Sequence, residues 1–531
     1  SRGLGDVYKR QFATRTDTEV LLHGWEQWGR ELLPRLRGMF AFALWDRRAG
    51  TLFCARDMFG IKPLYYCRCA DGTLLFASEI KAFLDHPSFE KRLNAAQLPL
   101  YLSCQYSPGR DTFFAGVEKL LPGHFLIFSD GIVRTTRWVQ PAFLPGETPV
   151  PPSELEAVLR DSAAAHKVAD VEVAGYLSGG VDSAYITALA RPGRTYTISY
   201  AEPRYDESFP ARALARSLGV RNRVRRISPG EFWDAVPAVQ YHMDEPLADA
   251  AAVALYFLNR EAAREVKVCL SGEGADELFG GYNIYRDPFT AQWYDRLPPW
   301  LRGGLGAAAG LLPPGPGVNF LVRRGLPLEE RYFGPTALMT EREKRRLLAD
   351  YEGDGDPMFL TEALWDSTEG LDPVSRMQQV DINLWLAGDI LLKADKMSMA
   401  HSLELRVPFL DRRVLAVALG LPRQYRCTAR RGKIALRAAA ARRLPRALAT
   451  NPKRGFPVPL ADWLRQDEYY ARVKAKFTGP VAERFFDTGA LCALLDDHRA
   501  GKTNAMTKIW AFYCFIEWYE VYFAEQKPPI L

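Results

Sequence analysis

The stretch "LSGGVDSAY", residues 177–185, decides the fold, because it joins a strand-like apolar run, "VEVAGYL", to a helix-like run. Gly179 and Gly180 let the backbone turn tightly and approach a ligand closely. The N–H groups of such a turn, with those of the helix start, form an anion site to which Ser178 and Ser183 add hydroxyls. The stretch therefore predicts a phosphate-binding turn. The plainer alternative is a capped helix whose glycines serve packing.

Asp182 and the end of this turn limit the kinds of phosphate chemistry that the site can perform. Asp182 is a poor neighbour for a phosphate unless a cation is present, so it implies bound Mg²⁺. The turn lacks the Gly-Lys-Ser/Thr ending of kinase-type phosphate loops, which disfavours transfer of a γ-phosphate.

Strand-like and helix-like runs alternate on both sides of the turn. The runs "RTYTISY", "RVRRI" and "VKVCL" are typical of strands, and "SFPARALARSLG" and "AVALYFLNREAARE" are typical of helices. This alternation predicts a doubly wound parallel sheet with right-handed crossovers. From about Pro288 onward we expect helices only, including the segment 391–411, "LLKADKMSMAHSLELRVPFLD".

A second glycine-rich segment, "CLSGEGADELFGGY" (269–282), follows the strand-like run "VKVCL". It places Glu273, Asp276 and Glu277 within five residues. In a parallel sheet both turns fall at the carboxyl ends of strands, where ligands bind. Three acids opposite an anion site suit bound Mg²⁺ or a base near the reacting centre. The alternative is a solvated helix start, which also favours acids.

Two further segments carry charge near these turns. In "MDEPLADAAAV" (243–253), an N-cap role is sufficient for Asp249. Lys433 and Arg437 are spaced to share one helix face, and Lys453–Arg454 precede a glycine. Few aromatics accompany these basic residues, so they suit a polyphosphate better than a nucleic acid, and a solvated surface helix is the alternative.

Length and composition limit the classes of protein to which the chain can belong. The chain has 531 residues, which predicts two or three domains, and its net charge of +6 does not imply a nucleic-acid or membrane partner. Eight scattered cysteines favour free thiols, and no apolar run reaches the ~18 residues of a membrane span, so we expect a cytoplasmic protein. Strand-like runs fill the N-terminal part, and the Pro-rich stretch 139–152 is the candidate linker.

The motifs taken together resemble one family. "LSGGVDS", "DEPLAD", "LSGEGADELFGGY", "KADKMSMAHSLELRVPFLD" and "KIALR…NPKRGFPVPLADWL" are similar, in order and spacing, to the glutamine-hydrolysing asparagine synthetases, and most to the bacterial form. The resemblance runs from Phe12 almost to the C-terminus. It implies an N-terminal-nucleophile glutaminase domain, an α/β/β/α sandwich, over residues 12–145. A doubly wound ATP-pyrophosphatase domain with a helical C-terminal part would follow over residues 146–531.

The resemblance also implies an activity: aspartate would attack ATP to give aspartyl-AMP and pyrophosphate, and ammonia would displace AMP. Glu273 would act near the acyl-adenylate and Lys433 would stabilise charge as pyrophosphate leaves, while Asp182 and Asp276 would hold Mg²⁺. The implied ATP-binding residues are Leu177, Ser178, Gly179, Gly180, Asp182, Ser183, Ile198, Ser271 and Gly272. Partners would be small molecules, namely aspartate, ATP and glutamine or ammonia, and a homodimer is left open.

The N-terminal part departs from the family pattern. "RTDTEV" matches the glutamine-binding motif and assigns that role to Asp17, but the family's N-terminal Cys nucleophile has no counterpart here. Cys54 lies too far past Asp17 to replace it. We therefore expect residues 1–11 to be a non-native junction, the glutaminase domain to be incomplete, and the chain to use free ammonia rather than glutamine.

Three alternatives to asparagine synthesis stay open at this point. A paralogue, such as a β-lactam-forming or peptide-cyclising synthetase or a sugar amidotransferase, would adenylate another carboxylate. A tRNA-modifying protein with the same loop would be expected to show paired cysteines and a stronger basic surface. A non-catalytic nucleotide-binding regulator would not need Glu273, Asp276 and Lys433.

Overall fold

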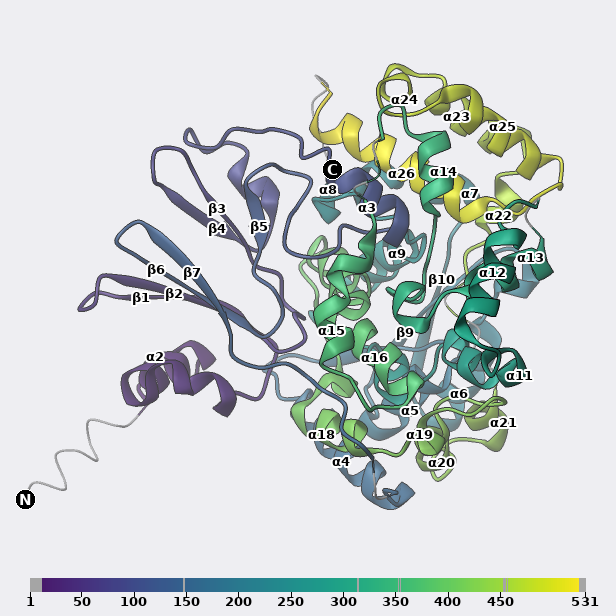
Figure 1. The fold of residues 1–531 in the computed structure, drawn as a ribbon. Coiled ribbons are helices and arrows are strands. Elements are labelled where there is room, and N and C mark those ends of the chain that lie inside the picture. The colour runs from purple at the N-terminus through teal and green to yellow at the C-terminus, as the bar shows by residue number, and fades with distance from the viewer. Residues whose placement is uncertain are drawn as a thin grey trace, which may run out of the picture.

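A computed structural model describes residues 12–146, 149–312, 315–351, 353, 355–451, 455 and 457–524 (Figure 1). The predicted junction, residues 1–11, and the basic pair Lys453–Arg454 lie outside the described residues. In the described part of the chain, no helix is long and apolar enough to cross a membrane.

The centre of the molecule is the predicted parallel sheet. Its five strands run in the order β10-β9-β8-β11-β12, and every neighbouring pair is parallel. The strands are β8 (Val173–Tyr176), β9 (Arg194–Ser199), β10 (Arg221–Arg226), β11 (Val268–Leu270) and β12 (Glu404–Arg406). All four residues of β8 are buried, as expected for a strand covered on both faces. The doubly wound architecture predicted from the alternation is thus confirmed.

Helices connect these strands and cover the sheet. They are α4 (Pro152–Ala165), α5 (Val181–Ala190), α6 (Ser208–Leu218), α7 (Pro229–Asp234), α8 (Val236–Met243), α9 (Ala251–Ala263) and α10 (Ala275–Phe279). Both α5 and α10 begin directly after a glycine-rich turn, so their N-terminal ends lie at the carboxyl edge of the sheet.

Two antiparallel sheets form the N-terminal layer, drawn in purple and blue in Figure 1. The first contains β1 (Ala41–Asp46), β2 (Thr51–Arg56), β6 (His124–Ser129) and β7 (Ile132–Arg137); the second contains β3 (Tyr65–Arg68), β4 (Leu74–Ala77) and β5 (Val117–Lys119). α2 (Asp17–Trp28) packs on the first sheet through Trp25, whose ring contacts Phe53. α3 (Gln97–Cys104) lies toward the rest of the molecule. No helix or strand occurs in the described part of the linker before Pro152.

Among the described residues after Pro288, the regular elements are helices except for the strand β12. The expectation of a helix throughout 391–411 is wrong, because the helix ends at Met399 and residues 404–406 form β12 at the sheet edge. Ser402 in a left-handed conformation (φ 52°) separates the two elements. The helices are α11 (Gln292–Asp295), α12 (Pro299–Ala309), α13 (Pro316–Gly325), α14 (Glu341–Leu347), α15 (Glu362–Asp366), α16 (Pro373–Asn383), the π-helix η7 (Leu386–Ile390), α17 (Leu391–Met399), α18 (Arg412–Gly420), α19 (Arg423–Arg426), α20 (Ile434–Ala440), α21 (Arg446–Thr450), α22 (Leu460–Trp463), α23 (Asp467–Phe477), α24 (Pro480–Phe485), α25 (Thr488–Arg499) and α26 (Met506–Tyr522).

The second antiparallel sheet and the parallel sheet share one hydrophobic core, while the buried residues of the first antiparallel sheet form smaller clusters of their own. Phe113 and Phe114 pack edge-on against Trp518 of α26. The buried carboxylate of Asp244 also ties the two parts together, since it accepts the backbone N–H of Ile80 at 3.1 Å and pairs with Lys81 at 2.8 Å. These contacts hold the N-terminal layer against α26 and the end of α8.

Candidate active site

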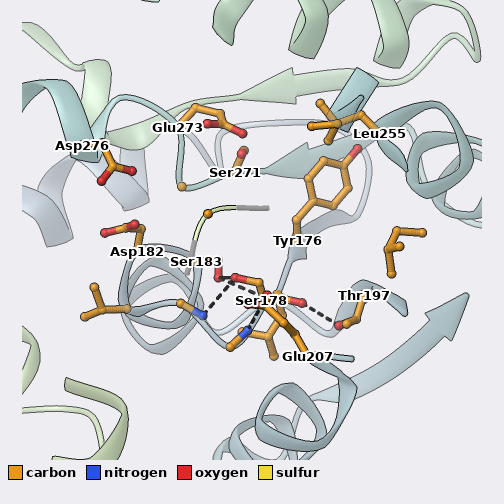
Figure 2. A pocket seen from close by; sticks show the side chains of 18 of the residues that line it. Tyr176, Ser178, Asp182, Ser183, Thr197, Glu207, Leu255, Ser271, Glu273 and Asp276 are labelled. Atoms are coloured by element: carbon orange, nitrogen blue, oxygen red, sulfur yellow. Dashed lines mark hydrogen bonds between the residues drawn. The ribbon is translucent and has the colours of Figure 1, made fainter. Parts of the chain in front are cut away.

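A cavity of about 700 Å³ opens at the carboxyl ends of β8, β9 and β11, where the sequence predicts a ligand site. Its size is that of a small-molecule site. Figure 2 shows Asp182 and Asp276 on one side, Tyr176, Thr197 and Leu255 on the other, and Ser271 and Glu273 along the edge that joins them.

The first glycine-rich turn is held by its own serines. Ser178 accepts the N–H of Gly180 at 3.1 Å, and its hydroxyl lies 2.9 Å from that of Ser183. The N–H of Gly179 donates to a carboxylate oxygen of Glu207 at 3.3 Å. The carboxylate of Glu207 thus already occupies one backbone donor of the turn, which agrees with the preference of a helix N-terminus for negative charge.

The second turn approaches the first so closely that only glycine fits. A Cβ on Gly272 would lie 2.8 Å from the backbone nitrogen of Ser183 and 3.1 Å from the Cβ of Asp182. Ser271 is buried and donates its backbone N–H to the carbonyl of Arg406 in β12 at 2.8 Å. The strand β12, which was not predicted from the sequence, thus holds the start of this turn in position at the sheet edge.

Lys433 joins the two turns. Its ammonium lies 2.6 Å from Asp182 and 2.7 Å from Asp276. Burial lowers the pKa of Lys433, but the attraction of the two carboxylates outweighs burial and leaves the pKa above its ordinary value. Lys433 is therefore a cation at neutral pH.

The backbone around Lys433 is unusual. Lys433 has a positive φ of 58°, a conformation that costs energy for a residue with a side chain and often marks functional sites. A Cβ on the neighbouring Gly281 would lie 2.1 Å from the Cε of Lys433 and 1.9 Å from Asp276. Both features place the ammonium between the two turns.

The structure offers partial support for a Mg²⁺ ion. One buried oxygen of Asp182, Oδ1, has no hydrogen-bond partner among the described residues. The described residues contain no group of three or more metal-ligating side chains. Mg²⁺ commonly takes one or two carboxylates and completes its shell with water and substrate phosphates. Asp182 and Asp276 fit a magnesium ion that arrives with a nucleotide.

The far end of the cavity is apolar. Leu177 and Ile198, two of the residues predicted to bind ATP, both border it and are both buried. The carbonyl of Leu177 accepts the hydroxyl of Thr197 at 2.6 Å. Sequence reasoning missed Tyr176, Thr197 and Leu255, although the first two lie next to predicted residues on β8 and β9.

The structure brings the predicted synthetase residues together and leaves the glutaminase residue apart. Glu273, Asp276 and Lys433 border the same cavity as residues 177–183. Arg437 also borders it, which supports a polyphosphate role over a solvated surface helix. Asp17 is exposed in the first turn of α2, and its role in binding glutamine stays a prediction. Cys54 is buried, and burial raises the pKa of its thiol to about 12, so it is not an activated nucleophile.

Another set of cavity residues carries no clear sequence signal. Trp385 directly precedes the π-helix η7, and Ile390 is the last residue of that helix. Lys393 follows on α17 and pairs with Asp249, which lies 144 residues earlier, just before α9. The predicted N-cap role of Asp249 is wrong, because Ala250 is the N-cap of α9; Asp249 accepts the N–H of Ala251 at 2.9 Å from just before the helix and also borders the cavity.

Comparisons with known proteins agree with this geometry. The family model for asparagine synthase matches residues 154–520, and the model for the glutamine amidotransferase domain matches residues 5–139. The second match begins inside the predicted junction, whose origin stays a prediction.

Several relatives match over nearly the whole chain, among them proteins of Bacillus subtilis and Mycobacterium tuberculosis. The Bacillus subtilis protein "Asparagine synthetase [glutamine-hydrolyzing] 1" is 37% identical over 98% of this chain and 83% of its own length. A Mycobacterium tuberculosis protein, to which the same enzyme name is provisionally given, is 41% identical over 98% of this chain and 82% of its own length. The chain therefore belongs to the asparagine synthetase family of carbon–nitrogen bond-forming enzymes, and the predicted combination of a glutaminase-type layer with an ATP-pyrophosphatase domain is confirmed.

Proposed function

We propose that the protein amidates L-aspartate to L-asparagine through aspartyl-AMP. An oxygen of the aspartate β-carboxylate attacks the α-phosphorus of ATP, and the bond to pyrophosphate breaks. The nitrogen of ammonia then attacks the acyl carbon, loses a proton and expels AMP. The observation that carries this proposal is the ammonium of Lys433, buried between two acids where both glycine-rich turns meet.

The charges of the site suit the first step. Pyrophosphate leaves with added negative charge, which a fixed, buried cation stabilises. Lys433 is such a cation, and the Ser178–Ser183 turn supplies hydroxyls and a helix N-terminus for the phosphates. Mg²⁺ held by Asp182 and Asp276 would neutralise phosphate charge when bound. The absence of a kinase-type lysine in the turn agrees with attack at the α-phosphorus.

We assign Glu273 to the second step. Its carboxylate borders the cavity beside Ser271 and Gly272, on the turn opposite the phosphate site (Figure 2). A carboxylate there can accept the proton that ammonia loses as the amide bond forms.

We propose that the nitrogen comes from glutamine, bound with the help of Asp17, or from free ammonia. Cys54, the first cysteine of the sequence, is buried and has a raised thiol pKa, so the 531-residue polypeptide should form asparagine with an ammonium salt and not with glutamine. Release of glutamate from glutamine by this polypeptide would contradict that expectation.

The central test is exchange of labelled pyrophosphate into ATP with a panel of carboxylic acids. Exchange with L-aspartate and no other acid supports the proposal, whereas exchange only with a larger acid indicates a paralogous function. Glu273→Gln should lower asparagine formation at least about 100-fold while ATP binding persists. Glu172→Gln is the matched control, since Glu172 pairs with Arg194 away from the cavity and should keep normal rates.

A further inference from the structure

A second buried lysine borders the same cavity. The ammonium of Lys393 lies 2.5 Å from Asp249 and 2.6 Å from Asp389. These three residues form the Lys393 cluster: Asp249 lies just before α9, Asp389 in the π-helix η7 and Lys393 in the first turn of α17. π-helical turns are rare and occur often at functional sites.

In the cluster, the carboxylate of Asp249 is partly exposed at the cavity and that of Asp389 is buried. Asp249 keeps 22% of its side-chain surface exposed, whereas Asp389 keeps none. Asp389 is held from behind by Gln105 at the end of α3, whose side-chain amide donates to it at 2.7 Å. The N-terminal layer therefore fixes Asp389, and Asp389 with Lys393 orients Asp249 toward the cavity.

The charge of the cluster favours a cationic ligand. Burial lowers the pKa of Lys393, but its two carboxylates outweigh burial and raise that pKa overall, so the lysine is charged. Burial raises the pKa of Asp389 to about 6, and for Asp249 burial is outweighed by Lys393, which holds the pKa below its ordinary value, so both carboxylates are ionised at neutral pH. One ammonium then faces two carboxylates, which leaves one unbalanced negative charge among mostly buried residues. Burial of such a charge is costly until a cation pairs with it.

The cluster also retains a donor for an anion. An ammonium has three N–H groups, and Asp249 and Asp389 take two of those on Lys393. A ligand with an ammonium and a carboxylate on one carbon, an α-amino acid, presents the two groups that Asp249 and Lys393 can bind.

We propose that Asp249 and Lys393 form the subsite for the α-ammonium and α-carboxylate groups of the acid substrate. This inference rests on the adenylation function proposed above, because the β-carboxylate of the same molecule must reach ATP at the Ser178–Ser183 turn. Both ends border one cavity, together with Trp385, Tyr282 and Asn283. The subsite therefore makes the enzyme select an amino acid over a plain dicarboxylic acid.

The test compares three acids in pyrophosphate release with saturating ATP and ammonium. L-Aspartate carries both α-groups, succinate lacks the ammonium, and β-alanine lacks the α-carboxylate. Asp249→Asn keeps the oxygen that accepts the N–H of Ala251 but removes the charge. It should lower kcat/KM for L-aspartate about 100-fold, as loss of a charged hydrogen bond in a buried site predicts, and change kcat/KM for succinate less than threefold.

The matched control is Asp395→Asn. Asp395 lies on the same helix, α17, and pairs with Lys62 at 2.7 Å, but it does not border the cavity. This variant should keep the wild-type ratio of aspartate to succinate. If Asp249→Asn does not fold, Asp249→Glu carries the same test, because it keeps the charge but displaces it by one methylene, and a tenfold fall in the ratio is expected.

The outcomes separate the two proposals. Equal losses for aspartate and succinate in Asp249→Asn would overturn the subsite and show a structural role. Wild-type activity with another α-amino acid instead of aspartate would overturn asparagine synthesis and leave the subsite standing. Equal wild-type use of aspartate and succinate would overturn the subsite alone.

Discussion

Two lysines that border the cavity make similar ion pairs, but their partner carboxylates have different surroundings. Lys433 lies between Asp182 and Asp276, and Lys393 lies between Asp249 and Asp389. Each ammonium is within 2.7 Å of two carboxylates. They differ in what surrounds the acids.

Both acids around Lys433 come from glycine-rich turns, and their side chains stay 21% and 16% exposed. Lys393 has one partly exposed acid and one, Asp389, that is fully buried and fixed by Gln105. The first arrangement leaves both carboxylates open to a nucleotide and its metal ion. The second leaves a single carboxylate open, which suits recognition of one group on a small substrate.

The largest effect should follow from removing the first lysine. Lys433→Met takes away the cation that stabilises the leaving pyrophosphate, so kcat for pyrophosphate release should fall about 1,000-fold. It also leaves two carboxylates facing each other, and breaking such a pair typically costs about 3–5 kcal/mol of unfolding free energy. Pyrophosphate release and urea unfolding measure the two effects. A kcat within tenfold of wild type would show that Lys433 is not the catalytic cation.

A smaller effect is expected from crowding the same lysine. In Gly281→Ala the added methyl would overlap Lys433 and Asp276, so the ammonium must shift and kcat should fall about 10–100-fold. Gly304→Ala is the matched control, because no atom lies within 4 Å of a Cβ there. Helix propensity favours that change, so its activity should equal wild type and its melting temperature should not fall. Full activity of Gly281→Ala would disprove the close packing around Lys433.

The two lysine clusters also differ in how far the sequence reveals them. The turns around Ser178 and Ser271 could be predicted, since glycines, acids and strand-to-helix changes are local signals. Their meeting could be predicted as well, because parallel strands present their carboxyl ends at one edge. Lys433 was assigned through the family resemblance, and the structure places it between the predicted acids.

The Lys393 cluster depends on packing that no local pattern encodes. In the sequence, a capping role is sufficient to explain Asp249, and Lys393 is one charge within a helical pattern, so neither residue indicates that the other is its partner. Two further features were hidden for the same reason: β12 is only three residues long, and Gln105 reaches Asp389 from a different layer. Tertiary contacts, rather than propensity, determine all of these.

Asp381 shows how burial raises the pKa of an aspartate that has no lysine beside it among the described residues, unlike the aspartates of the two lysine clusters. Asp381 on α16 is fully buried and accepts hydroxyls of Tyr285 and Tyr332, and in the described part of the chain no cation pairs with it. Burial raises its pKa from 3.8 to about 8. The folded state therefore binds a proton that the unfolded state loses, so stability should fall as pH rises from about 4 to about 8.

Asp381→Asn should remove this pH dependence, because an amide oxygen can accept the same two hydroxyls without ionising. The variant should gain stability relative to wild type by about 1 kcal/mol per pH unit between pH 5 and 7. Urea unfolding at pH 5, 6 and 7 measures the difference. Parallel curves for the two proteins would show that Asp381 is ionised in the fold.

The smallest effect should come from the contact behind the Lys393 cluster. Gln105 has a left-handed φ of 67°, which asparagine tolerates well, so Gln105→Asn keeps the backbone but shortens the amide by one methylene. Asp389 then loses a hydrogen bond in a buried site, which costs about 1 kcal/mol and should raise KM for aspartate about fivefold with KM for ATP unchanged. Lys62→Met removes a different contact between the same two layers, 2.7 Å long, without touching the cluster, so it should leave both KM values unchanged. If both variants raised the KM values for aspartate and ATP alike, Gln105 would only hold the two layers together. If only Gln105→Asn raised KM, and only for aspartate, the N-terminal layer would be shown to position the acid subsite.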